Sequence, residues 1–160
     1  MNYFDTIKND NLKYNFLKVL IDENRFKKFN RNDKCKLTKK MKKLSSLEVI
    51  SFKSKKEIIP NNFNDKDTIM MGTSGAWCVD LFRHIRNSIF HGRTEVINKK
   101  ETKYFVFKDY SSNSCDKQTA YICLNEDNYN KCIQYYNEAL KQIEKTNSYA
   151  DKNYRKREAA

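Results

Sequence analysis

The sequence predicts a mainly α fold: a bundle of four to five helices, with a small β-hairpin between the central helix and the last one. Only three glycines and one proline occur in 160 residues, which disfavours a turn-rich all-β fold. Apolar residues recur at helical spacing over most of the chain, and β-type patterns are confined to residues 94–124. We expect a single domain over residues 1–147 and a frayed polar tail over residues 148–160.

Two amphipathic helices are expected in the first third of the chain. The first follows a cap at Asn9 or Asp10 and presents Leu12, Phe16, Leu17, Leu20 and Ile21 at three- and four-residue steps. The second is marked by Leu37, Met41, Leu44, Leu47 and then Val49 or Ile50. Residues 53–67 contain the proline and predict a loop between two halves of one bundle. Residues 68–72 are expected to form a helical turn.

Residues 73–93 predict the central helix. Its start has a cap in Thr73 or Ser74, and Gly92 is suited to the left-handed position that ends many helices. At 3.6 residues per turn, one flank is apolar and formed by Cys78, Leu81, Phe82, Ile85 and Ile89. The opposite flank is polar and carries Arg83, His84, Asn87 and His91. We therefore expect one side in the core and the other in a functional site.

The remaining segments predict the hairpin and a closing helix. Residues 94–97 are β-prone, 98–102 form a turn, and 104–107 pair with 119–124 as antiparallel strands. Asn125 is suited to cap the last helix. Its apolar stripe repeats at three- and four-residue steps and consists of Tyr129, Cys132, Ile133, Tyr136, Leu140 and Ile143.

Positive charge is concentrated in one segment. The formal net charge is +12, and residues 25–56 contain thirteen basic residues against two acidic ones. Such a patch suits a polyanion, and contacts to a phosphate backbone are expected from Lys39, Lys40 and Lys43 on the second helix. The alternative is a solvated lysine-rich face without a ligand.

The cysteine pattern indicates reduced thiols rather than a disulfide framework or a zinc site. There are five cysteines, an odd number, and none forms a C-x-x-C pair. No apolar run is long enough for a signal peptide or a membrane span. We expect a cytoplasmic protein with no membrane contact, no metal and no cofactor.

The polar flank of the central helix contains the arrangement R-N-x-x-x-H, formed by Arg86, Asn87 and His91. A lone histidine there has a simpler explanation, because the last turn of a helix favours a cation. The whole segment 81–92, LFRHIRNSIFHG, nevertheless resembles the motif of the HEPN superfamily, whose ribonuclease members carry an arginine, often a polar residue after it, and a histidine near the end of a core helix. The layout of helices and hairpin resembles that superfamily less closely.

The resemblance implies a HEPN-like helical bundle and a metal-independent endoribonuclease in prokaryotic defence or a toxin–antitoxin system. Such an enzyme lets the RNA 2′-hydroxyl attack the phosphate and leaves a 2′,3′-cyclic phosphate. The resemblance also implies a homodimer with a composite active site, because two motif helices face each other in HEPN nucleases. An antitoxin or another defence protein is a further expected partner.

Chemistry assigns roles to the motif residues. Histidine exchanges protons near neutral pH, so His91 is expected to act as acid or base. The guanidinium of Arg86 suits the phosphate as charge builds up, and Asn87 would orient one of these groups or the substrate. Five residues turn a helix by about 500°, which leaves Arg86 and His91 about 140° apart. Arginine reach and an unwound last turn would bring them together, and a second copy would complete the site.

Three other residues near the motif are weaker candidates for substrate binding: Arg83, His84 and Arg93. Two alternatives to the enzyme stay open. One is a non-catalytic HEPN module that binds RNA, a nucleotide or a partner protein. The other is a basic helical scaffold in which the R-N-x-x-x-H arrangement is accidental.

Overall fold

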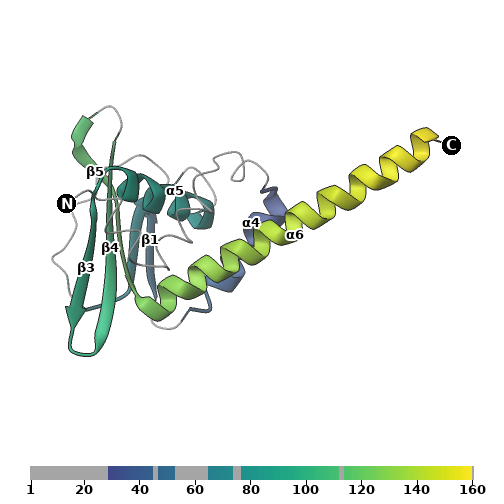
Figure 1. Ribbon diagram of the computed structural model, residues 1–160. Helices are drawn as coiled ribbons and strands as arrows, with labels where there is room; N and C mark the ends of the chain where they lie inside the picture. Colours follow the sequence, from purple (N-terminus) through teal and green to yellow (C-terminus); the bar gives the residue numbers. More distant parts are fainter. Residues whose placement is uncertain (1–28, 45–46, 53–64, 74–76, 112–113, 160) are drawn as a thin grey trace.

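The computed structural model describes residues 29–44, 47–52, 65–73, 77–111 and 114–159. These residues form three helices packed on a five-stranded sheet (Figure 1). The helices are α4 (Arg31–Met41), α5 (Trp77–Phe90) and α6 (Glu126–Ala159). The strands are β1 (Glu48–Phe52), β2 (Thr68–Gly72), β3 (Thr94–Lys99), β4 (Thr102–Ser111) and β5 (Ser114–Asn125). The expected first helix, around residues 12–21, and most of the expected loop lie outside the described residues.

The predicted helical bundle with a small hairpin is wrong, because the chain builds a mixed sheet with the order β1-β2-β5-β4-β3. β1 and β2 are parallel, and the other neighbours are antiparallel. Residues 49, 50 and 68–72 were expected to be helical and are strands instead. They are short apolar runs rich in β-branched residues, and such runs fit a buried strand as well as a helix. Pairing decides in favour of the strand: β2 pairs with β5, about fifty residues further along the chain, and β1 pairs with β2.

The strands predicted after the central helix are confirmed in position but are longer than expected. β3 pairs with β4 around a turn at Lys100, which has a φ of 54°. β4 and β5 have 10 and 12 residues, so they extend well beyond a small hairpin and form the middle of the sheet.

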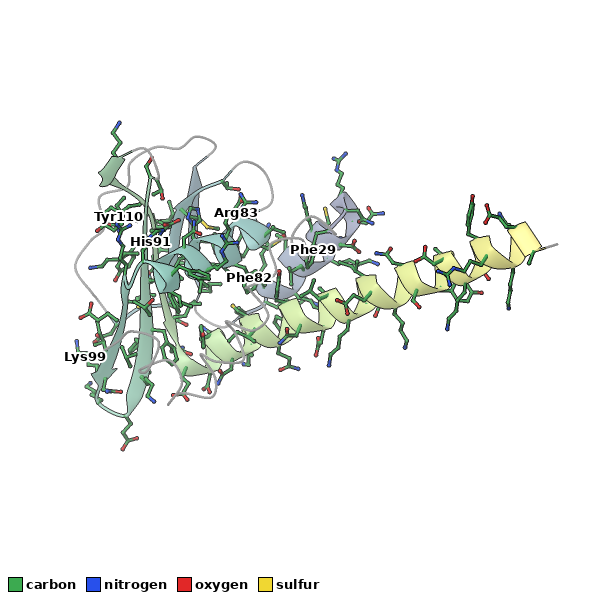
Figure 2. The ribbon with its side chains drawn as sticks, turned by 45° about the horizontal axis from the view of Figure 1, so that its top comes forward. Phe29, Phe82, Arg83, His91, Lys99 and Tyr110 are labelled. Atoms are coloured by element: carbon green, nitrogen blue, oxygen red, sulfur yellow. The ribbon has the colours of Figure 1, made fainter. Side chains whose placement is uncertain are left out.

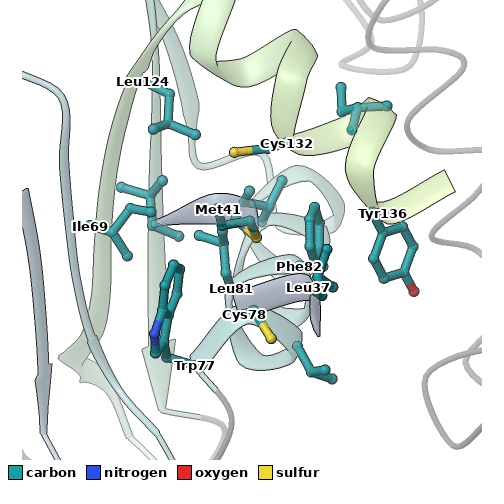
Figure 3. Close-up of a cluster of buried hydrophobic side chains, with 14 of the residues drawn as sticks. Leu37, Met41, Ile69, Trp77, Cys78, Leu81, Phe82, Leu124, Cys132 and Tyr136 are labelled. Atoms are coloured by element: carbon teal, nitrogen blue, oxygen red, sulfur yellow. The ribbon is translucent and has the colours of Figure 1, made fainter. Parts of the chain in front are cut away.

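One face of the sheet carries the main core. Alternate residues of β2, β4 and β5 point toward the helices and are buried: Ile69, Met71, Phe105, Phe107, Ile122 and Leu124. The predicted apolar flank of α5 is confirmed, because all five of its residues are at most 2% exposed. The predicted stripe of α6 is buried as well, and its Tyr136 ring lies 4.2 Å from the ring of Phe82 (Figure 3).

α4 and α6 pack together beside this core. Asn30 caps α4 through a capping box with Asp33, and the helix ends at Met41 rather than continuing to residue 47. Asn125 caps α6 as predicted, since its side-chain oxygen accepts a hydrogen bond from the Asn128 backbone at 2.8 Å. In the described part of the chain, no helix is both long enough and apolar enough to cross a bilayer.

α6 continues without interruption through residues 148–159, which were expected to be a tail. It has 34 residues and spans about 50 Å, so its second half extends beyond the sheet and ends at the C-terminus (Figure 1). Lysine, arginine, glutamate and alanine favour helix there even without a core to pack on. The domain boundary at residue 147 stays a prediction, but the helix does not end at that point.

Candidate functional site at the end of helix α5

The C-terminal end of α5 is fixed by a glycine cap. Gly92 has a φ of 66°, as predicted, and its N–H donates to the Ile89 carbonyl at 3.2 Å. The next N–H, that of Arg93, donates to the Ser88 carbonyl at 2.8 Å. This pair of hydrogen bonds is a Schellman motif, which ends a helix and turns the chain away from it. His91, just before Gly92, is therefore held at the helix end, where its side chain is exposed.

Arg86 and His91 lie on the last turns of α5. Arg86 is half-buried, and its Cζ atom lies 5.8 Å from the centre of the Phe90 ring. The His91 N–H donates to the Asn87 carbonyl at 3.0 Å, which is an ordinary helical hydrogen bond. The expected unwinding of the last turn is thus absent. The backbone directions of Arg86 and His91 stay about 140° apart around the helix axis.

Asn87 is attached to a buried carboxylate that the sequence analysis did not select. Its Nδ2 donates to Asp109 Oδ2 at 3.2 Å, so its amide is directed at β4 rather than at the other two motif residues. Asp109 Oδ1 accepts a hydrogen bond from the Tyr110 N–H at 2.9 Å. The alternation of Phe105, Phe107 and Asp109 on one face of β4 is the sequence signal that places this carboxylate inside.

His84 belongs to the same network. Its Nδ1 lies 2.7 Å from Asp109 Oδ2, and its Nε2 lies 3.1 Å from the carbonyl oxygen of Gly72. Only 14% of the His84 side chain and 6% of the Asp109 side chain are exposed. Both ring nitrogens thus lie within hydrogen-bond distance of an oxygen, and the His84 ring joins α5 to β2 and β4. Because both nitrogens are engaged in this buried network, His84 is a poorer candidate for proton transfer than the exposed His91.

Arg83 and Arg93 occupy different surroundings. Arg83 is 53% exposed and pairs with Asp80 at 3.2 Å, within α5. Asp80 also accepts a hydrogen bond from the hydroxyl of Thr73 at 2.6 Å. Residues 74–76 lie outside the described residues, so the predicted cap of α5 at Thr73 or Ser74 stays a prediction. Arg93 lies beyond Gly92, and its Cζ atom is 4.4 Å from the centre of the Tyr110 ring. In Figure 2, His91 and Tyr110 lie together where α5 meets the strands.

The predicted lysine contacts lie on and just after α4, near the other end of α5. Lys39 on α4 and Lys43 two residues beyond it are exposed, and Lys40 pairs with Glu138 of α6 at 3.4 Å. A pocket of about 480 Å³ lies between α4 and α6 and includes Lys40. α4 contacts the first turn of α5, where Thr38 donates to the sulfur of Cys78 at 3.0 Å. Cys78 is thirteen residues before His91, which corresponds to about 20 Å of helix.

The buried cysteines are protonated thiols rather than nucleophilic thiolates. Burial raises the pKa of Cys123 and of Cys132 to about 12, and it also raises the pKa of Cys78. A thiol with a raised pKa carries little thiolate at neutral pH. Among the described residues, no three His, Cys, Asp or Glu side chains are grouped as metal ligands.

Comparison with known families identifies the class of this helix and sheet assembly. A family model described as HEPN pEK499 p136 matches residues 7–147. The match spans most of the chain, so the chain belongs to this HEPN family, and the predicted superfamily membership is confirmed. No curated protein and no solved structure matches it. Membership supports a nuclease or an RNA-related module as the broad class of function.

Proposed function

We propose that the protein is a metal-independent endoribonuclease whose active site includes Arg86 and His91. The observation that carries this proposal is an exposed histidine at the capped end of α5, five residues after a half-buried arginine, in a chain of a HEPN family. Both groups lie at the surface end of a rigid helix, where an RNA strand has access to them.

The proposed reaction uses the groups that this helix end supplies. The RNA 2′-hydroxyl attacks the adjacent phosphate, the P–O bond to the 5′-oxygen breaks, and a 2′,3′-cyclic phosphate and a 5′-hydroxyl result. His91 transfers a proton to or from one of these oxygens, because imidazole serves as acid or base near neutral pH. Arg86 stabilises the negative charge on the phosphate in the transition state. Asn87 acts indirectly, by holding α5 on Asp109.

In this proposal the enzyme is a homodimer with a composite active site. The intact last turn of α5 separates Arg86 from His91 around the helix axis, and a second copy would supply the missing group from across the interface. Phe90, beside Arg86, is 48% exposed, which suits the centre of an interface better than a solvated surface. We further propose a cytoplasmic role in defence or in a toxin–antitoxin pair, with an antitoxin or defence protein as partner.

Replacing Phe90 with aspartate tests the dimer. A charge at the centre of an apolar contact is costly to bury, so Phe90→Asp should be a monomer in light scattering at micromolar concentrations where the wild type is a dimer. It should also lose RNA cleavage. Tyr149→Asp is the matched control, because Tyr149 is 70% exposed on the distant half of α6. Equal masses for wild type and Phe90→Asp would contradict this interface.

Incubation of the purified protein with mixed RNA in excess EDTA tests the proposed function. We expect fragments that end in a 2′,3′-cyclic phosphate, identified by mass spectrometry. Loss of cleavage on chelation, with recovery on addition of Mg²⁺, would contradict the metal-independent mechanism. RNA binding without cleavage under either condition would favour the non-catalytic HEPN module, for which the lysine-lined pocket between α4 and α6 is the candidate surface.

A further inference from the structure

A pocket of about 540 Å³ opens beside the end of α5, where the chain passes from the helix into β3. Its wall begins at Gly92, the residue after His91, and continues through β3 and β4. Its lining includes Gly92, Arg93, Thr94, Glu95, Lys108 and Tyr110. Of these residues, only Arg93 was predicted from the sequence to contact the substrate.

Arg93 and Tyr110 form a cation–π pair in this wall. The backbone of Arg93 is held at both ends, because its N–H donates to Ser88 and its carbonyl accepts from the Lys108 N–H at 3.1 Å. Its guanidinium then lies over the Tyr110 ring at 4.4 Å. Unpaired RNA bases stack on aromatic rings and on guanidinium planes, so this pair suits a nucleobase.

The other lining groups supply polar contacts. Lys108 and Arg93 are cationic and suit a phosphate, whereas the carboxylate of Glu95 suits the N–H donors of a base edge. The hydroxyl oxygen of Thr94 is buried and has no hydrogen-bond partner in the described part of the chain. A buried polar atom without a partner is unusual in native proteins, and this one belongs to a residue of the pocket wall next to Arg93.

The pocket wall is also connected to α5 by hydrogen bonds. Asp109 accepts hydrogen bonds both from Asn87 on α5 and from the backbone of Tyr110. The Arg93–Tyr110 pair and the Arg86–His91 end of α5 are therefore fixed relative to each other through one buried carboxylate.

We propose that this pocket binds one unpaired nucleotide next to the scissile linkage, with its base on the Arg93–Tyr110 pair and its phosphate near Lys108. The enzyme would then select single-stranded RNA, because a base held in a duplex cannot enter the pocket. This inference rests on the proposed function, but binding at the pocket is measurable without cleavage.

The test uses a fluorescent single-stranded oligonucleotide with 2′-O-methyl groups, which cannot be cut by 2′-hydroxyl attack. Tyr110→Ala should raise its dissociation constant about tenfold, as expected when a stacking platform is lost. Tyr110→Phe keeps the ring and should bind within about twofold of the wild type. Tyr149→Ala, on exposed α6, is the control and should leave binding unchanged. Equal binding by Tyr110→Ala and the wild type would overturn the proposal.

Cross-linking of the wild type provides a second measurement that does not depend on the folding of a variant. The same oligonucleotide carrying one 4-thiouridine is irradiated with the protein, and the modified peptide is identified. Attachment within residues 92–95 or 108–110 supports the pocket, and attachment confined to α4 and α6 overturns it. If natural RNA is not cleaved but the cross-links lie in the pocket, the proposed ribonuclease activity is contradicted and the proposed nucleotide site is supported.

Discussion

Replacing His91 with alanine is expected to reduce RNA cleavage by about 10²–10⁴-fold, the usual contribution of one positioned acid or base. The chain has two histidines, and the structure separates their roles. His84 contacts Asp109 and the Gly72 carbonyl through its two ring nitrogens, so it cannot replace His91. Single-turnover cleavage of a defined oligonucleotide measures the loss.

The cleavage rate should also depend on the guanidinium group of Arg86. Arg86→Ala removes the charge that stabilises the phosphate, and a loss of about 10²–10³-fold is expected for one such group. Arg86→Lys keeps the charge but not the planar pair of donors, so its cleavage rate should fall between that of the wild type and that of Arg86→Ala. Arg157→Ala, exposed near the end of α6, is the matched control. Cleavage by His91→Ala at the wild-type rate would exclude the assigned site.

Replacing Asp109 with alanine is expected to cost about 1–3 kcal/mol of unfolding free energy, because it leaves the buried ring of His84 without its hydrogen-bond partner. The same change removes the acceptor for Asn87 and for the Tyr110 N–H. Urea unfolding followed by circular dichroism measures the difference. Asp151→Ala, at an exposed position of α6, should change stability by less than about 0.5 kcal/mol.

A double-mutant cycle separates the His84–Asp109 contact from the rest of the network. With His84 replaced by glutamine, the contact of the imidazole with Asp109 is already lost, so Asp109→Ala should then cost clearly less than in the wild type. If Asp109→Ala destabilises the protein no more than Asp151→Ala does, the buried network does not hold α5 to the sheet.

The sequence predicts those elements of the fold whose periodicity is long and regular. The stripe from Tyr129 to Ile143 and the apolar flank of α5 extend over several turns, and both are buried as expected. β1 and β2 have five residues each, which is too short to distinguish a strand from a helical turn. The state of β2 depends on pairing with β5 and that of β1 on pairing with β2, and contacts that distant in sequence leave no local pattern.

The candidate site likewise contains features that can be predicted from the sequence and features that depend on the folded structure. The order of Arg86, His91 and Gly92 along one helix is visible in the sequence, and the glycine cap follows from it. The partner of Asn87 is not visible, because Asp109 lies 22 residues further on and approaches only when β4 packs against α5. The pocket also needs the folded sheet, since Arg93 and Tyr110 come from two different strand regions.

The most direct test of the central claim is cleavage of an RNA oligonucleotide in which the nucleotide at the mapped cut site carries a 2′-deoxyribose. Attack by the 2′-hydroxyl predicts that the wild-type enzyme, in EDTA, cuts the all-ribose strand and leaves the substituted linkage intact. Cutting of both strands at that linkage at equal rates would contradict the proposed chemistry.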